Sequence, residues 1–267
     1  MLNSLPKLLG VVWLSWVSIG VAVDSVPPPA WLAKVPAPQV GPFPPLAARE
    51  LHYTGGWGKL PAGKVTIAFS QKDGRQILHA TGGTIGLARG LFLLDSDTLA
   101  ECDPVTLEPM RAVLDETYSD EKRHTIQTFT PESVTRVRTT EPRQKDDGKV
   151  KVYRLPHVFD LQSSLLYLRS QPLKNGDEVV FLTYATGSPY IAKVTVLGRS
   201  EIEVRAGKFH AIEVQLSLVG IDKDLSLKSY RRARDIRAWL SDDAERNFLK
   251  ISASILVGAV FVELDNR

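Results

Sequence analysis

The sequence predicts a mostly β protein: a curved antiparallel sheet closing towards a barrel, with one short helix. Three observations predict it. Apolar and polar residues alternate along many segments after residue 48, glycine-containing turns separate these segments, and a single segment has helical periodicity. Closely spaced strands joined by tight turns are typical of sandwiches and barrels. We therefore expect one β-rich domain over residues 49–267.

The first 22 residues predict a cleavable signal peptide. Lys7 is the only charge before an apolar run from Leu8 to Val23, and the small residues Gly20 and Ala22 suit cleavage after Ala22. The alternative is an uncleaved anchor, but this run of about 16 residues is shorter than the roughly 20 that span a bilayer. We therefore expect an exported, periplasmic protein.

Residues 23–48 form a proline-rich linker. Proline removes amide donors and favours the extended polyproline II conformation, so neither a helix nor a sheet is expected here. The segment predicts a spacer that holds the domain away from a surface, and the alternative is a ligand for a partner's aromatic groove. The prolines are Pro27, Pro28, Pro29, Pro36, Pro38, Pro42, Pro44 and Pro45.

From Arg49 onward the residues alternate with a period of two. Val65, Ile67 and Phe69 alternate with less apolar neighbours, and similar patterns follow in residues 179–184, 191–197, 202–204 and 209–216. Such alternation indicates half-buried antiparallel strands. Turn residues separate the strands at Asp73-Gly74, Asp147-Gly148, Asn175-Gly176 and Ala206-Gly207.

The glycine-rich run in residues 82–86 lacks the lysine-serine pair of a phosphate loop, so it predicts a bulge or tight bend.

One helix is expected after Asp160, whose carboxylate can cap the first turn. Leu161, Leu165 and Leu168 follow at helical spacing, and Pro172 ends the segment. A short helix laid across the mouth or open side of a curved sheet would bury this leucine stripe.

Composition and motifs exclude several classes of function. The net charge is +3, and it becomes +2 without Lys7, so charge gives no case for nucleic-acid binding. The single cysteine, Cys102, excludes an internal disulfide and a zinc site of several cysteines. Its neighbours Glu101 and Asp103 disfavour a reactive thiolate, so we expect a buried thiol. Because nucleophile-elbow, phosphate-loop, zinc-helix and calcium-loop motifs are missing, we expect neither an enzyme nor a metal or cofactor site.

Two charged clusters are candidate sites. Asp242-Asp243 could bind calcium or perform acid/base chemistry, and the alternative is a turn in which aspartate accepts backbone amides. Arg231, Arg232 and Arg234 could contact anionic lipid heads at a membrane surface. The alternative for these arginines is a solvated strand face that protects a sheet edge.

Arg169 and Tyr167 end the expected helix. By default Arg169 has a structural role, because a cation in the last turn interacts favourably with the helix dipole. If the helix borders a cavity, Arg169 could instead bind a ligand carboxylate or phosphate. We expect two tryptophans, Trp57 and Trp239, to belong to the core or to line a cavity. The candidate ligand-binding residues are therefore Trp57, Tyr167, Arg169, Trp239, Asp242 and Asp243.

Several segments occur in a recognisable order along the chain. They are Leu51-His52-Tyr53, Trp57, Ala62-Gly63-Lys64, Asp160 to Arg169, Pro172-Leu173, Gly176-Asp177, Val204 to Phe209, Ala238 to Asp243, Gly258 and Glu263-Leu264. This ordered set resembles an exported bacterial family, domain of unknown function 3108, over roughly residues 50–265. The resemblance implies an envelope protein with a curved antiparallel sheet, similar in architecture to lipocalin-like or half-barrel folds, and it carries over no catalytic residue.

These observations favour a non-enzymatic binding or carrier module for an apolar or amphipathic envelope molecule, because small barrels can hold one ligand. One alternative is an envelope hydrolase that acts on glycan or lipid through a carboxylate site such as Asp242 and Asp243. Another is a structural domain that presents a sheet edge to an envelope protein.

Overall fold

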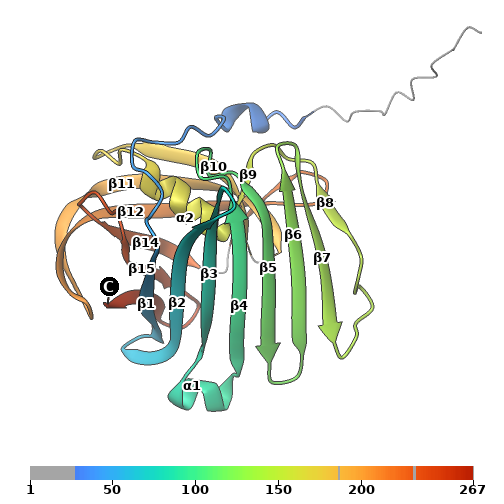
Figure 1. Cartoon of the computed structure of the whole chain (residues 1–267), viewed down its shortest axis with the longest axis horizontal. Helices are drawn as coiled ribbons and strands as arrows, with labels where there is room; N and C mark the ends of the chain where they lie inside the picture. The colour runs from blue at the N-terminus through green and yellow to red at the C-terminus, as the bar shows by residue number, and fades with distance from the viewer. Residues whose placement is uncertain (1–27, 186, 231–232, 267) are drawn as a thin grey trace, which may run out of the picture.

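A computed structural model describes residues 28–185, 187–230 and 233–266 of the chain. The predicted signal peptide lies outside the described residues, and so do Arg231 and Arg232. The described residues form a strongly curved sheet with a helix packed on its inner side (Figure 1). The prediction of a mostly β, curved antiparallel fold is confirmed.

Sixteen strands join one sheet in the described part of the chain. They are β1 (Arg49–Trp57), β2 (Leu60–Lys72), β3 (Arg75–Thr84), β4 (Leu94–Cys102), β5 (Pro109–Tyr118), β6 (Lys122–Thr130), β7 (Ser133–Glu141), β8 (Lys151–Tyr153), β9 (Val158–Asp160), β10 (Glu178–Ala185), β11 (Ser188–Val204), β12 (Gly207–Ile221), β13 (Leu227–Ser229), β14 (Arg234–Ser241), β15 (Phe248–Ser254) and β16 (Ala259–Asn266).

Strand order follows the chain almost throughout. The order runs β8-β7-β6-β5-β4-β3-β2-β1-β16-β15-β14-β12-β11-β10-β9, with β13 paired to β12. The last strand, β16, therefore pairs with the first, β1, in the middle of the sheet. The two edges, β8 and β9, are consecutive in the chain but are not hydrogen bonded to each other, so the sheet is curved without closing.

Local sequence explains the tight connections. Strands β2 and β3 pair up to Lys72 and Arg75, and Asp73 and Gly74 between them have φ angles of 52° and 72°. Both residue types tolerate this left-handed conformation, which a two-residue hairpin requires. The predicted turn at Asp73-Gly74 is therefore confirmed.

Helix α2 (Leu161–Ser170) begins where the sequence predicts. The Asp160 side chain accepts hydrogen bonds from the amides of Gln162 and Ser163 at 2.7 and 3.0 Å, which satisfies two free donors of the first turn. The expectation that the three leucines at helical spacing are all buried is partly wrong, because Leu161 is 53% exposed. Leu168 is buried as expected, and Leu166, which the prediction did not include, is buried with it.

Two further short helices accompany α2, so the expectation of one helix is corrected. A 3-10 turn, η1 (Leu32–Lys34), precedes the sheet, and α1 (Gly86–Leu91) connects β3 to β4. Of the glycines predicted to form a bulge or tight bend, Gly82 and Gly83 instead complete β3, where a Cβ on Gly83 would lie 2.4 Å from Asp95 Oδ1. Gly86 begins α1 with a φ of 54°.

Residues 35–48, which we call the strap, lie against α2 (Figure 1). The amides of Gln39, Gly41 and Phe43 donate to the Tyr167 hydroxyl, Ser170 Oγ and the Ser170 carbonyl at 3.1–3.3 Å. Because proline has no amide hydrogen, the prolines of the strap leave few other backbone donors that need a hydrogen-bond acceptor. The described part of the proline-rich segment is therefore packed on the domain, contrary to the predicted free spacer.

The core fills the inside of the curved sheet with side chains from both halves. Cys102 belongs to it with 1% exposure, as predicted, and burial raises the pKa of its thiol to about 12. At neutral pH this thiol is protonated and unreactive.

None of the helices in the described residues combines the length and the hydropathy that a membrane span requires.

Candidate functional site

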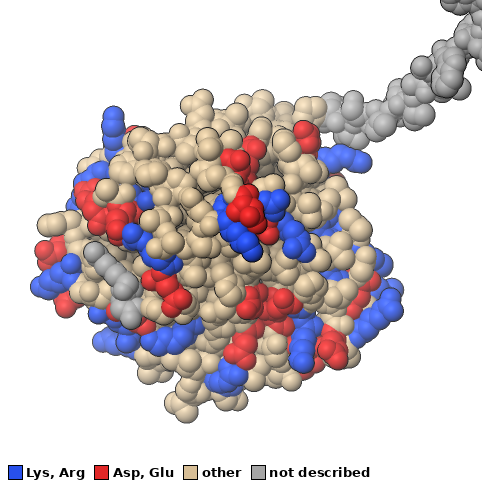
Figure 2. Space-filling view, viewed as in Figure 1, with Lys and Arg blue, Asp and Glu red and all other residues tan. Residues whose placement is uncertain are grey.

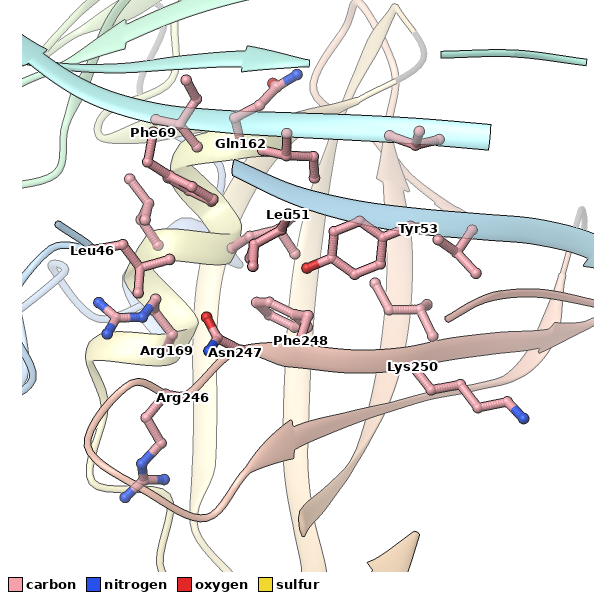
Figure 3. A pocket seen from close by; sticks show the side chains of 17 residues that line it. Leu46, Leu51, Tyr53, Phe69, Gln162, Arg169, Arg246, Asn247, Phe248 and Lys250 are labelled. Carbon is pink, nitrogen blue, oxygen red and sulfur yellow. The ribbon is translucent and has the colours of Figure 1, made fainter. Parts of the chain in front are cut away.

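A pocket of about 90 Å³ lies between α2 and the central strands (Figure 3). Strands β1 and β2 form one wall, and β15 and β16 form another. Helix α2 and the strap residue Leu46 close it from the side opposite the sheet.

Alternation along β1 and β2 makes the first wall apolar. Leu51 and Tyr53 project from β1, and Val65, Ile67 and Phe69 project from β2. Residues two apart point to the same face of a strand, and Leu51 pairs directly with Ile67 and Tyr53 with Val65. These side chains therefore form one continuous apolar surface.

Helix α2 supplies the opposite side. Gln162, Leu165, Leu166 and Arg169 line the pocket at helical spacings of three and four residues. Only Leu165 of the predicted leucine stripe lies on this face. The cap at Asp160 sets where the helix starts, and so it sets which residues face the sheet.

Arg169 connects three segments around the pocket. Its Nε and Nη2 donate to the Glu245 carbonyl at 3.1 and 2.7 Å, and its Nη1 donates to the Pro44 carbonyl. Burial, together with the charges of Arg49 and Arg246, lowers the pKa of Arg169 to about 10. The guanidinium joins α2, the strap and the loop after β14.

The loop of residues 242–247 carries Arg246 and Asn247 to the pocket. Asp243 Oδ1 accepts the amides of Glu245 and Arg246 at 3.0 and 3.1 Å, which is the turn geometry considered as the alternative for this residue. Asp242 pairs with Arg199 at 2.9 Å. Both carboxylates therefore have local partners that hold the loop.

Two polar atoms face the apolar space. Asn247 is 2% exposed, and its Oδ1 is buried without a hydrogen-bond partner among the described residues, while its Nδ2 donates to Glu245 Oε2 at 2.7 Å. The Tyr53 hydroxyl points into the pocket (Figure 3) and has no hydrogen bond to a described residue. Burial raises the pKa of this hydroxyl, so it stays protonated at neutral pH.

A buried acceptor and a neutral hydroxyl can together orient one hydrogen-bonding group of a mostly apolar molecule. Among the described residues, no group of three or more His, Cys, Asp or Glu is placed to hold a metal ion.

Of the six candidate residues, Arg169 alone lines this pocket. Tyr167 points to the other side of α2, where its ring stacks on Phe159 with centroids 4.7 Å apart. Trp239 lies on β14 and packs against the core as a partly buried residue. The structure therefore does not bring the six residues together.

Trp57 is the clearest departure from the expected core or cavity position. It lies at the end of β1 and is 49% exposed, and its Nε1 donates to the Val257 carbonyl at 2.7 Å. Of the predicted basic cluster, the structure describes Arg234, which is exposed at the start of β14.

Sequence reasoning missed Tyr53, Asn247 and Phe248. The strand pattern of β2 was visible, but alternation alone does not show which face lines a cavity. Asn247 has no pattern of its own, because tertiary contacts of its loop place it.

A solved structure shares this fold. The protein is similar to a β-barrel-like protein of domain of unknown function DUF1849 from Brucella abortus, with 8% identity, a TM-score of 0.55, and coverage of 83% of this chain and 97% of that one. It also matches a Bacteroides fragilis protein described as exported, with a YmcC-like fold, at 7% identity, a TM-score of 0.35, and coverage of 85% and 99%. A Parabacteroides distasonis protein described as a lipoprotein matches at 9% identity, a TM-score of 0.33, and coverage of 86% and 99%.

No curated protein matches this sequence. The family model described as a protein of unknown function, DUF3108, matches residues 50–265. This range contains every strand of the sheet and leaves out only the first residue of β1, Arg49, and the last residue of β16, Asn266. The resemblance found in the sequence is thereby confirmed. On this match, the chain belongs to the DUF3108 family of proteins of unknown function.

Proposed function

We propose that this protein is a non-enzymatic binding or carrier module of the cell envelope for a mostly apolar molecule. The observation that carries the proposal is the pocket under α2, with its apolar walls and the unpartnered Asn247 Oδ1. A buried acceptor without a partner costs free energy, which a ligand hydroxyl or amide would recover.

The pocket also restricts the shape of the ligand. An apolar cavity of roughly 150 Å³ holds one benzene molecule, so about 90 Å³ suits an unbranched chain better than a ring system. The ligand class is therefore a chain with one hydroxyl or amide group near Asn247.

Filling the pocket tests the proposal. Leu165→Trp places an indole in the space between α2 and β1, and Leu99→Trp adds the same ring to an exposed position on β4. We expect the dissociation constant for the probe 1-octanol, measured by isothermal titration calorimetry, to rise about tenfold or more in Leu165→Trp and to stay unchanged in Leu99→Trp. Equal binding by both variants would contradict the proposal.

The same two variants test whether the protein carries a natural ligand in this pocket. Protein purified from the cell envelope should release an apolar chain-like molecule on organic extraction and mass spectrometry. Leu165→Trp protein should release much less of it than Leu99→Trp protein. A wild-type extract that holds no such molecule would count against the carrier role.

Export is part of this proposal. It rests on the signal-peptide pattern of residues 1–22. Fractionation of cells that produce the full chain should place the protein in the periplasm, with Val23 as the first residue by N-terminal sequencing. Recovery in the cytosol with an intact leader would contradict it.

A further inference from the structure

Three connections at one end of the sheet expose large apolar side chains. They join β1 to β2, β3 to β4 through α1, and β15 to β16. We call their exposed side chains the tip surface. It consists of Trp57, Leu60, Leu87, Leu91, Phe92, Ile255, Leu256 and Val257.

The three connections are neighbours in space. Their strands are adjacent in the order β4-β3-β2-β1-β16-β15. The Gly58 amide donates to the Ala259 carbonyl at 2.8 Å, and the Ile85 amide donates to the Ala62 carbonyl at 2.9 Å. Trp57 Nε1 bonds the Val257 carbonyl across the first and last of these connections. The tip surface is therefore one surface.

Exposure here goes well beyond the scattered apolar residues of an ordinary surface. Leu87 and Leu91 on α1 are 88% and 89% exposed, and Leu256 is fully exposed at 101%. In Figure 2 the lower edge of the molecule, where α1 lies in Figure 1, is mostly tan, without charged side chains at its extremity. Contiguous exposed apolar surface of this kind marks a contact site.

The charge of the same connections is positive. Residues 57–64, 85–93 and 255–260 contain Lys59, Lys64 and Arg89 and no Asp or Glu. Lys64 and Arg89 pair with carboxylates of the strands, whereas Lys59 has no ion pair with a described residue. Arg234, exposed and paired in register with Ser254, adds a cation beside the third connection.

We propose that the tip surface docks the protein on an anionic phospholipid bilayer. Leucines that project separately from three tips need a partner that can surround each one, and fluid lipid does so without a matching shape. Trp57 and Phe92 suit the interfacial depth, where aromatic rings are favoured, and the cations suit anionic headgroups. This inference uses other residues than the pocket and stands apart from the ligand proposal.

A fluorescent label tests where the protein meets lipid. Cys102 is buried, so a thiol-reactive nitrobenzoxadiazole dye labels only an introduced cysteine. Leu256→Cys places the dye on the tip surface, and Leu197→Cys places it on an exposed part of β11. With vesicles of phosphatidylcholine and about 30% phosphatidylglycerol, we expect a blue shift and an intensity gain of about twofold or more for Leu256→Cys alone.

Several results would overturn the proposal. These are equal responses of the two labels, no response of either, or an equal response to vesicles of phosphatidylcholine alone. A blue shift of the Leu256→Cys label that grows with protein concentration without lipid would instead assign the surface to a second copy of the chain.

A second measurement uses unlabelled protein. The double variant Leu87→Ser, Leu91→Ser should sediment with the anionic vesicles about tenfold less than the wild type. Val105→Ser, at an exposed apolar residue of the β4–β5 turn, is the matched control and should sediment like the wild type. All proteins are prepared from the envelope in the same way, so any contribution of residues before 28 is common to them. Unchanged sedimentation of the double variant would contradict the role of α1.

Discussion

Asp265 connects the last strand to the first two strands. The Thr54 hydroxyl donates to its two carboxylate oxygens at 2.8 and 2.7 Å, and Lys64 donates to it from β2. Burial raises the pKa of Asp265, but the hydrogen bonds from Lys64 and Thr54 outweigh burial and lower the pKa below its ordinary value. The ionised carboxylate therefore stabilises the contact between β16 and β1.

We expect this contribution to depend on pH with a definite sign. Because the folded-state pKa lies below the unfolded-state value, the stabilisation is present above the unfolded-state value of about 4 and is lost as pH falls through the folded-state pKa. Asp265→Asn should lower the free energy of unfolding by about 1 kcal/mol at neutral pH. Urea unfolding at several pH values should show this difference shrinking below about pH 4, and a constant difference would contradict the assignment.

At the scale of elements, α2 determines the shape of the pocket. Its start depends on the buried Asp160 carboxylate, which also accepts the Ser163 hydroxyl at 3.1 Å. Its end is held by the strap, since Gly41 approaches the Ser170 carbonyl so closely that a Cβ would lie 2.0 Å from the oxygen. Both ends of the helix are thus set by side chains and backbone outside the helix itself.

Asp160→Ala should lower the free energy of unfolding by about 1–2 kcal/mol, because two amides of the first turn lose their acceptor. Asp160→Asn keeps an oxygen in this position and should lose less. Urea unfolding followed by circular dichroism measures both. Equal losses in the two variants would show that the cap is not the source of the effect.

At the scale of the whole molecule, the sheet has two short edges instead of a closed hydrogen-bonded ring. Within the described residues, strand β8 pairs only with β7, and β9 pairs only with β10. Side chains partly bridge this gap, since the rings of Tyr153 on β8 and Tyr184 on β10 meet edge to face with centroids 5.8 Å apart. By contrast, the long strands β11 and β12 pair along most of their length.

The difference between the short pairing of the edge strands and the long pairing of β11 with β12 predicts which part of the sheet opens first. Amides of β8 should exchange with deuterium faster than those of Ala211–Val214 in β12 by about two orders of magnitude, because local opening of a short edge breaks few contacts. Hydrogen exchange with mass spectrometry measures both segments in one experiment. Similar protection in β8 and β12 would indicate that the edges are closed in solution.

Local patterns predicted much of this fold. Alternation in residues such as Val65, Ile67 and Phe69 predicted half-buried strands, and the Asp73-Gly74 turn and the Asp160 cap were recognisable because each depends on a few neighbouring residues. The position of Leu161 was predicted wrongly. Helical spacing identifies residues that share a face, but the direction of that face depends on what the helix packs against.

The sequence by itself determined the β class and the start of α2, because these follow from the period of the apolar residues and from capping, whereas the burial of Cys102 was an expectation that only the structure decided. Only the tertiary structure decided that the proline-rich strap packs on α2, that Asn247 faces an apolar pocket, and that Trp57 meets Val257. The physical reason is distance along the chain. Strand β16 reaches β1 from some 200 residues away, and no local pattern records the curvature that brings them together.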